Sequence, residues 1–140
     1  MIELKNIEDK LKKEDFIISD INGNSMSPFL KEKRDKVVIT KLVKEPQLYD
    51  VILYKNNNKY VLHRIIGIND DKYLIRGDNC ISIEYIDKNR IIGVLNAYYN
   101  NDDYIEINED INKYYFNKSN NSLLFRRIKA KASSIIRMNK

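Results

Sequence analysis

The sequence predicts a mainly β fold, a single domain of mostly antiparallel strands with a short N-terminal helix and a basic C-terminal helix. Two observations carry this prediction. Short segments rich in Ile, Val and Tyr are separated by Asn, Asp, Gly and Lys residues, which is typical of strands joined by turns. At both ends of the chain, apolar residues instead recur at helical spacing among charges. With 140 residues, the chain can bury a substantial core without disulfides or metal ions.

The two ends of the chain are expected to be helical, and the region between them forms the β body. Residues 1–16 are predicted to form an amphipathic helix, because apolar residues recur among charges at helical spacing, namely Leu4, Ile7 and Leu11. The β body is expected over residues 17–118. A basic helix or tail follows over residues 119–140, with Ser122 as its candidate N-cap.

The β body is expected to consist of hairpin-connected strands. The candidate strands are FIISDI, DKVVITKLV, DVILYKN, KYVLHRIIGI, KYLIRG, RIIGVLNAYY and DYIEIN. The separators NNNK, from Asn56 to Lys59, and NDDK, from Asn69 to Lys72, are short enough for hairpins. Neighbouring strands should therefore pair antiparallel.

The net charge of +5 is concentrated at the C-terminal end, while the rest of the chain is close to neutral. Residues 126–140 contain no acid, and their basic residues are Arg126, Arg127, Lys129, Lys131, Arg137 and Lys140. Such a tail is either a solvated helix face or a surface for an anionic partner. We expect peripheral association with an anionic membrane. Nucleic-acid binding is not expected, because no recognised motif is present and the tyrosines lie mostly in the β body.

Targeting segments and metal sites are not expected. Charges interrupt the N-terminal segment from its first residues, so it does not resemble a signal peptide or membrane anchor. Cys80 is the single cysteine and His63 the single histidine, so neither a disulfide within the chain nor a zinc site is expected, and no cofactor is implied. These features predict a cytoplasmic protein that is at most peripheral to a membrane.

The stretch INGNSMSPFL contains a candidate nucleophile, Ser25. Gly23 and Pro28 bracket it, so the backbone is expected to turn sharply there and to present a small hydroxyl. A serine in such a bend is ordinarily a turn or cap residue. Catalysis would also require a base, a group that orients the base, and donors for an oxyanion.

His63 and two acids are the further candidates. In YVLHRIIG, alternation places His63 on one strand face with Val61 and Ile65. A lone histidine there is ordinarily a core or surface residue, but a buried imidazole needs a partner on each nitrogen. The segment RGDNCISIEY puts Asp78 and Glu84 in one loop, and either could orient the imidazole if the loop folds back on it.

The order of these motifs resembles the signal peptidase I and SOS-repressor peptidase superfamily. GNSMSP, YDVILY, LHRIIG, RGDN and IIGVL follow one another from about Asp20 to Leu95, and the chain is similar to the small, soluble signal-peptidase-like members. The resemblance implies a serine endopeptidase with Ser25 as nucleophile and His63 as general base. Archaeal and endoplasmic-reticulum signal peptidases likewise have a histidine where bacterial enzymes have a lysine.

The resemblance leaves the third member of the site open. Gly77-Asp78-Asn79 matches the Gly-Asp-Asn element of the superfamily, and Glu84 aligns with the acid that supports the imidazole in histidine-type members. The site is therefore expected to be a Ser-His dyad or a triad completed by Asp78 or Glu84. Met26 and Pro28 match positions that shape the turn, and Asp50 matches the acidic start of the following strand.

The chain also departs from the superfamily pattern. Gly23 stands where many signal peptidases have a serine that assists the oxyanion hole, so backbone N–H groups, including that of Ser25, should serve there. The sequence is not expected to contain the transmembrane anchor that is usual in signal peptidases, nor the N-terminal DNA-binding domain of SOS-repressor peptidases. The implied substrate is an extended peptide or a protein, bound by strand addition beside the Ser25 turn. The alternative is a non-catalytic peptide-binding or regulatory module of the same fold.

Overall fold

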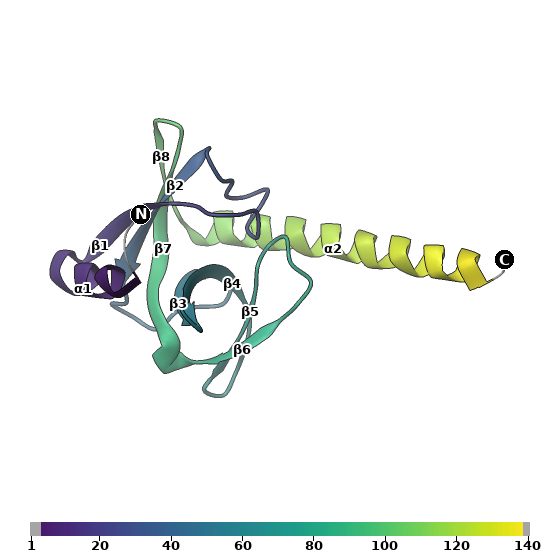
Figure 1. Cartoon of the computed structure of the whole chain (residues 1–140), viewed down its shortest axis with the longest axis horizontal. Coiled ribbons are helices and arrows are strands. Elements are labelled where there is room, and N and C mark those ends of the chain that lie inside the picture. The colour runs from purple at the N-terminus through teal and green to yellow at the C-terminus, as the bar shows by residue number, and fades with distance from the viewer. Residues whose placement is uncertain (1–3, 139–140) are drawn as a thin grey trace.

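One antiparallel sheet of eight strands forms the body of the protein (Figure 1), which confirms the prediction of a mainly β fold. The computed structural model describes the backbone of residues 4–138 and the side chains of residues 7–124. The strands are β1 (Phe16–Asp20), β2 (Asp35–Lys41), β3 (Val51–Asn56), β4 (Lys59–Asn69), β5 (Lys72–Arg76), β6 (Glu84–Asp87), β7 (Ile91–Asn100) and β8 (Asp103–Glu106). The helices are α1 (Leu4–Glu14), the short 3-10 helix η1 (Lys88–Arg90) and α2 (Glu109–Met138).

Strand β7 is the centre of the sheet. It pairs with β2 on one side, and with β3 and then β8 along the other. The main path of the sheet runs β1-β2-β7-β3-β4-β5-β6. The sheet also curls. In the strand order β4 and β5 lie between β3 and β6, yet the side chain of Glu84 at the start of β6 contacts Tyr54 and Asn56 on β3.

Two buried clusters share strand β3. Its alternate side chains point to opposite faces, so Val51 and Leu53 enter one cluster while Ile52 and Tyr54 enter the other. The first core also contains side chains from α1, β1, β2, β7 and the Ser25 turn, namely Leu11, Ile17, Met26, Phe29, Leu30, Val37, Ile39, Leu95 and Tyr98. The second core fills the curl of the sheet with Ile65, Tyr73, Ile75, Ile86 and Ile91. His63 lies on the face of β4 that borders this second core.

Both predicted hairpins are confirmed. Asn56 pairs with Lys59, and Asn69 pairs with Lys72, so each connection is a two-residue turn. The first residue of each turn has a positive φ, 56° at Asn57 and 53° at Asp70. Asn and Asp tolerate this conformation better than most residues, which explains how these separators set the register of β3, β4 and β5.

Strand β6 was not predicted. Glu84 was expected in a loop with Asp78, but it is the first residue of β6 and pairs with Ile75 of β5. Only four residues form this strand, and three of them are charged or polar, namely Glu84, Tyr85 and Asp87. Its one buried apolar side chain, Ile86, enters the second core. Pairing with β5 therefore decides the structure of this segment, and its own composition does not.

The boundary between the β body and the C-terminal helix was predicted too late. Helix α2 begins at Glu109, so residues 109–118 are helical and Ser122 lies inside the helix rather than at its N-cap. The cap is Asn108, whose side-chain oxygen accepts a hydrogen bond from the N–H of Ile111 at 2.8 Å. Two acids in the first turn, Glu109 and Asp110, favour this start through the helix dipole.

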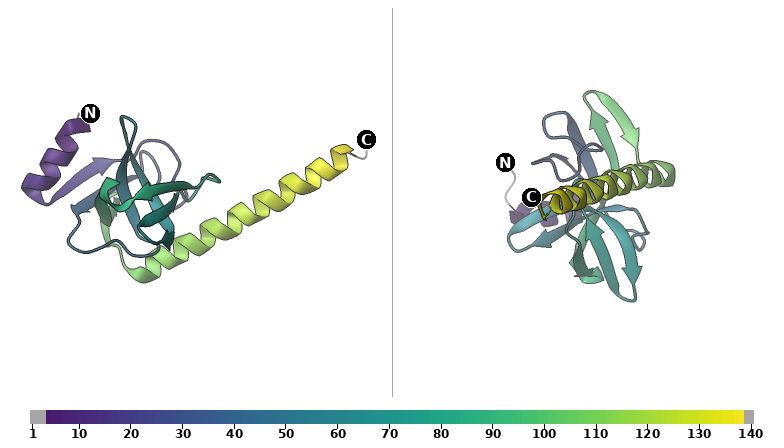
Figure 2. Two further views of the ribbon diagram at one scale, coloured as in Figure 1. Left: turned by 90° about the horizontal axis from the view of Figure 1, so that it is seen from below. Right: turned by 90° about the vertical axis from the view of Figure 1, so that its right-hand side faces the viewer.

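The first turns of α2 pack on the β body, and the rest of the helix extends beyond it (Figures 1 and 2). Tyr115 stacks on Phe29 with ring centroids 4.3 Å apart, and Phe116 stacks on Tyr49 at 4.4 Å. Leu123 is also buried. The basic side chains of residues 126–140 lie outside the described side chains. Within residues 4–138, neither α1 nor α2 combines the length and apolar character that membrane crossing requires.

A buried arginine joins α2 to the sheet. The Arg64 side chain on β4 is 0% exposed, and it binds the Asp78 carboxylate through two hydrogen bonds of 2.8 and 2.9 Å. Its third nitrogen, Nη1, donates to the Tyr49 carbonyl and to the side-chain oxygen of Asn112 on α2. Ser119, about two turns further along α2, donates to the Asp78 carbonyl at 2.5 Å. Four separate segments therefore meet at one guanidinium.

Asp78→Ala should lower the free energy of unfolding by about 3–5 kcal/mol, because it leaves the Arg64 cation buried without its counter-ion. Urea denaturation followed by circular dichroism measures the loss. The matched control is Asp20→Ala, which removes the exposed 3.9 Å ion pair with Lys36 and should cost less than about 1 kcal/mol. Similar losses in the two variants would contradict a central role for the Arg64–Asp78 pair.

Candidate active site

A tight turn presents Ser25. Gly23 has φ +80°, a conformation that side chains disfavour, although a β-carbon there would meet no neighbour within 4 Å. The N–H of Ser27 then donates to the carbonyl of Asn24 at 3.1 Å, and Pro28 lies exposed in the same turn. The turn is fixed to the first core by the buried side chains of Met26, Phe29 and Leu30. Ser25 is therefore held at the surface of the body by buried residues that follow it directly.

The segment after β5 closes on this turn. The N–H of Asn79 donates to the Ser25 carbonyl at 2.8 Å, and the Asn79 side chain donates to the carbonyl of Asn24 at 3.2 Å. A β-carbon at Gly77 would lie 2.8 Å from the Ser25 carbonyl oxygen and 2.9 Å from Nε2 of His63. The main chain of Ser25 and the imidazole of His63 thus approach one point, which only a glycine leaves open.

His63 faces this point with Nε2, while its other ring nitrogen, Nδ1, lies 3.4 Å from the hydroxyl of Tyr54. Its strand neighbours Val61 and Ile65 contribute to the second core, in line with the predicted alternation. Burial lowers the pKa of His63 below its ordinary value of 6.5, against the opposing effect of the Glu84 and Asp78 carboxylates. The imidazole is consequently neutral near pH 7, as a general base must be.

Among the described side chains, no hydrogen bond joins the Ser25 hydroxyl to His63. Such bonds are often long in enzymes without substrate and shorten when the substrate binds. The Ser25 N–H donates to no backbone acceptor of residues 4–138 and to no described side chain of residues 7–124, so it would be available to an oxyanion. Gly23 contributes no side-chain donor, so the use of backbone donors for an oxyanion stays a prediction.

The two candidate acids lie in different environments. Asp78 is buried, and its carboxylate is bound to Arg64. Glu84 accepts a 3.1 Å hydrogen bond from the Tyr54 hydroxyl and two 3.3 Å hydrogen bonds from the side-chain nitrogen of Asn56. The Glu84 carboxylate therefore reaches the neighbourhood of His63, and Tyr54 is its contact there.

Asp50 and Cys80 border the site without joining its centre. The Asp50 carboxylate accepts a 2.8 Å hydrogen bond from the N–H of Gln47, which closes the turn that leads into β3. Burial raises the pKa of Asp50. The Cys80 thiol lies 3.9 Å from the Ser25 carbonyl oxygen, and burial raises the pKa of this thiol as well. Neither group contacts the His63 ring among the described hydrogen bonds.

Sequence reasoning did not identify Tyr54 and Arg64. Tyr54 could have been found from the hairpin at NNNK. Its register pairs Asn56 with Lys59, and this places Tyr54 diagonally across from His63 on the same face of the sheet. For Arg64 the sequence offers only its place on a strand flanked by apolar residues. Its partners Asp78 and Asn112 are far away along the chain.

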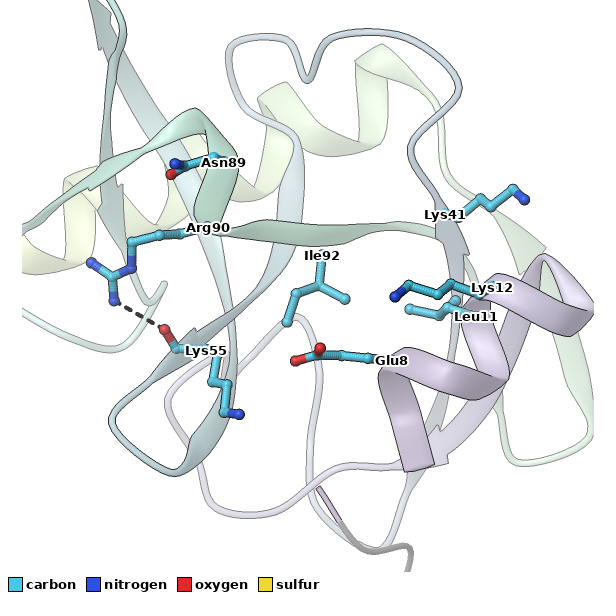
Figure 3. A pocket seen from close by; sticks show the side chains of 8 residues that line it. All are labelled: Glu8, Leu11, Lys12, Lys41, Lys55, Asn89, Arg90 and Ile92. Carbon is cyan, nitrogen blue, oxygen red and sulfur yellow. Dashed lines mark hydrogen bonds between the residues drawn. The ribbon is translucent and has the colours of Figure 1, made fainter. Parts of the chain in front are cut away.

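Two pockets of similar volume lie away from this site. One of about 360 Å³ is formed where α1 approaches the ends of β2, β3 and β7 (Figure 3), and is lined by Glu8, Leu11, Lys12, Lys41, Lys55, Asn89, Arg90 and Ile92. Several of its charges are already engaged: Tyr60 donates to Glu8, Lys41 pairs with Asp15, and Arg90 donates to the Lys55 carbonyl. None of its lining residues belongs to the Ser25 region.

A metal site is not apparent among the described side chains, where no three His, Cys, Asp or Glu residues are grouped closely enough to hold an ion. Comparison with protein-family models and with curated proteins finds no match to this chain. The assignment of a function therefore depends on the geometry around Ser25, His63 and Gly77.

Proposed function

We propose that this protein is a signal-peptidase-like serine endopeptidase, in which Ser25 is the nucleophile and His63 the general base. One observation carries the proposal: the Ser25 carbonyl and Nε2 of His63 both approach the α-carbon of Gly77 so closely that a β-carbon would clash with both. A serine in a surface turn, a neutral imidazole and an unengaged N–H at the serine are the parts that acyl transfer needs. The meeting of the Ser25 turn and the His63 ring at Gly77 supports this proposal.

The mechanism follows from these positions. Nε2 of His63 accepts the proton of the Ser25 hydroxyl as its oxygen attacks the carbonyl carbon of a peptide bond. The N–H of Ser25 donates to the oxyanion that forms. His63 then gives the proton to the leaving amine, the carbon–nitrogen bond breaks, and an ester to Ser25 remains. Water, deprotonated by His63, hydrolyses this ester and releases the new carboxyl end.

The proposed substrate is a peptide or protein in an extended conformation. Strand β1 leads directly into the Ser25 turn and stands at the end of the strand order, so its outer edge pairs with no other strand of residues 4–138. A peptide that adds to this edge would satisfy the free backbone groups of β1 and run toward Ser25. Phe16 and Ile18 on β1 are exposed, which leaves apolar surface for its side chains.

A fluorophosphonate probe should label the wild-type protein once, as read by intact mass, because an activated serine attacks phosphorus as it attacks an acyl carbon. Ser25→Ala and His63→Ala should not be labelled. Ser19→Ala is the matched control, since its half-buried hydroxyl on β1 donates to the Asp20 carbonyl and this variant should react like the wild type. A folded wild type that is neither labelled nor active in a peptide-cleavage screen would favour the peptide-binding alternative.

The rate of labelling should rise with pH and reach its plateau below neutrality. The base must be unprotonated, and burial lowers the pKa of His63 below 6.5, so the rate is lost only as the pH falls through that lowered value. Stopped samples across pH 4 to 9 would measure the midpoint, with unfolding followed in parallel by circular dichroism. A midpoint well above 7 would indicate a different base.

Gly77→Ala should reduce labelling by about 100-fold, because the new methyl group would clash with the Ser25 carbonyl, with the His63 ring and with Sγ of Cys80, and would force these groups apart. Gly67→Ala is the control. The atoms nearest to a β-carbon at Gly67 would belong to the Leu74 side chain, at 3.4 Å or more, which is an ordinary contact. Equal rates in the two variants, both folded, would show that the space at Gly77 does not matter for the reaction.

A further inference from the structure

We propose that Tyr54 is a positioning residue that joins His63 to Glu84, so that the acid of this site acts on the imidazole through a phenol and not by direct contact. This inference rests on the proposed function and extends it. In the triads of many serine hydrolases the acid binds the histidine itself. Here the hydroxyl of Tyr54 stands between the two groups.

The direction of the hydrogen bonds follows from what each group can donate. Glu84, as a carboxylate, only accepts, and the Tyr54 hydroxyl has a single proton. That proton is directed to Oε2 of Glu84, 3.1 Å away. The phenol oxygen is then left as the acceptor for Nδ1 of His63, at 3.4 Å. His63 therefore carries its neutral proton on Nδ1, which leaves the lone pair of Nε2 for the Ser25 proton.

The fold holds Tyr54 in this role. Its side chain is 0% exposed, and its ring packs edge-on to His63 with centroids 6.3 Å apart. The register of β3 and β4 sets Ile52 opposite His63 and Tyr54 opposite Val61, so Tyr54 and His63 are diagonal neighbours on one face. Burial and the neighbouring Glu84 raise the pKa of Tyr54, so the phenol keeps its proton throughout the working range of the enzyme.

Glu84 is held in place by a second residue. The side-chain nitrogen of Asn56 lies 3.3 Å from each of its two carboxylate oxygens. Asn56 and Tyr54 are two residues apart on β3, so they share a face and hold the carboxylate together. The curl of the sheet that brings β6 back to β3 therefore places the acid beside the tyrosine.

The other charged and titratable groups around His63 are already engaged or neutral. Asp78 is paired with Arg64, and the raised pKa of Cys80 keeps its thiol protonated near pH 7. Arg90 acts on Tyr54 only through its charge. The Tyr54–Glu84 pair is consequently the group best placed to select the tautomer of His63 and to stabilise its cation during the reaction.

Because His63 is the only histidine in the chain, its ring can be observed directly by ¹H–¹⁵N NMR in the full-length protein. The wild-type spectrum at neutral pH should show the proton on Nδ1. Tyr54→Phe keeps the ring but removes the acceptor, so a mixture with the Nε2-protonated form should appear. Glu84→Gln should lower the midpoint of the His63 titration, because a carboxylate that favours the cation is lost.

The labelling rate gives the functional arm of the test. Tyr54→Phe should react about 10- to 100-fold more slowly than the wild type, and Glu84→Gln should also be slower. Adding the second change to the first should cost little more, since both act along one chain of hydrogen bonds. Tyr60→Phe is the matched control, because its hydroxyl donates to Glu8 at the other face of the body and its loss should change neither tautomer nor rate.

The NMR measurement tests the role of Tyr54, and the labelling measurement tests the peptidase function on which that role rests, so the failure of one can be told from the failure of the other. A wild-type His63 protonated on Nε2, or a Tyr54→Phe spectrum identical to that of the wild type, would overturn the role of Tyr54 even if Ser25 is labelled. A tautomer that follows Tyr54 in a protein that is neither labelled nor active in the peptide-cleavage screen would support the bridge and contradict the peptidase. If Tyr54→Phe does not fold, the wild-type spectrum and Glu84→Gln still decide.

Discussion

The guanidinium of Arg64 is the constraint on which the rest of the structure depends. A cation that is wholly buried has to be neutralised and hydrogen-bonded on every side, and this one is satisfied by Asp78, Asn112 and the Tyr49 carbonyl. These partners belong to the segment after β5, to α2 and to the turn before β3. The body can therefore assemble in full only when all of these segments are in place around β4.

The same ion pair fixes the candidate site through its sequence neighbours. His63 precedes Arg64 and Gly77 precedes Asp78, so an ion pair formed inside the protein places the two preceding residues beside each other. This explains how Asp78 can be part of a Gly-Asp-Asn element without touching the imidazole. Asp78 positions the main chain through Arg64, and both Asp78 and Glu84 act on the charge of His63 against the effect of burial.

Local signals in the sequence were sufficient for the strands and their hairpins, because Asn57 and Asp70 occupy turns that few other residue types accept. Local signals were insufficient where tertiary contacts determine the secondary structure of a segment. The aromatic residues Tyr114, Tyr115 and Phe116 favour strands by composition, yet the Asn108 cap and packing on the body make them helical. For the candidate site, the sequence predicted the turn at Ser25 and the strand face of His63, whereas the positions of Asp78 and Glu84 depend on the path of residues 77–84.

The Arg64–Asp78 ion pair lies next to His63 and Gly77 in the sequence, and this limits which substitutions the chain can accept. A substitution of Arg64 or Asp78 is expected to shift His63 and Gly77 as well. Changes at these positions would therefore affect the stability of the fold and the geometry of the candidate site together. Glu84 and Asn56 lie on the other side of the imidazole and touch neither Arg64 nor Asp78 in the described hydrogen bonds. Substitutions that would alter the proposed reaction while leaving the scaffold intact are therefore expected mainly where β3 and β6 meet, at Asn56 and Glu84.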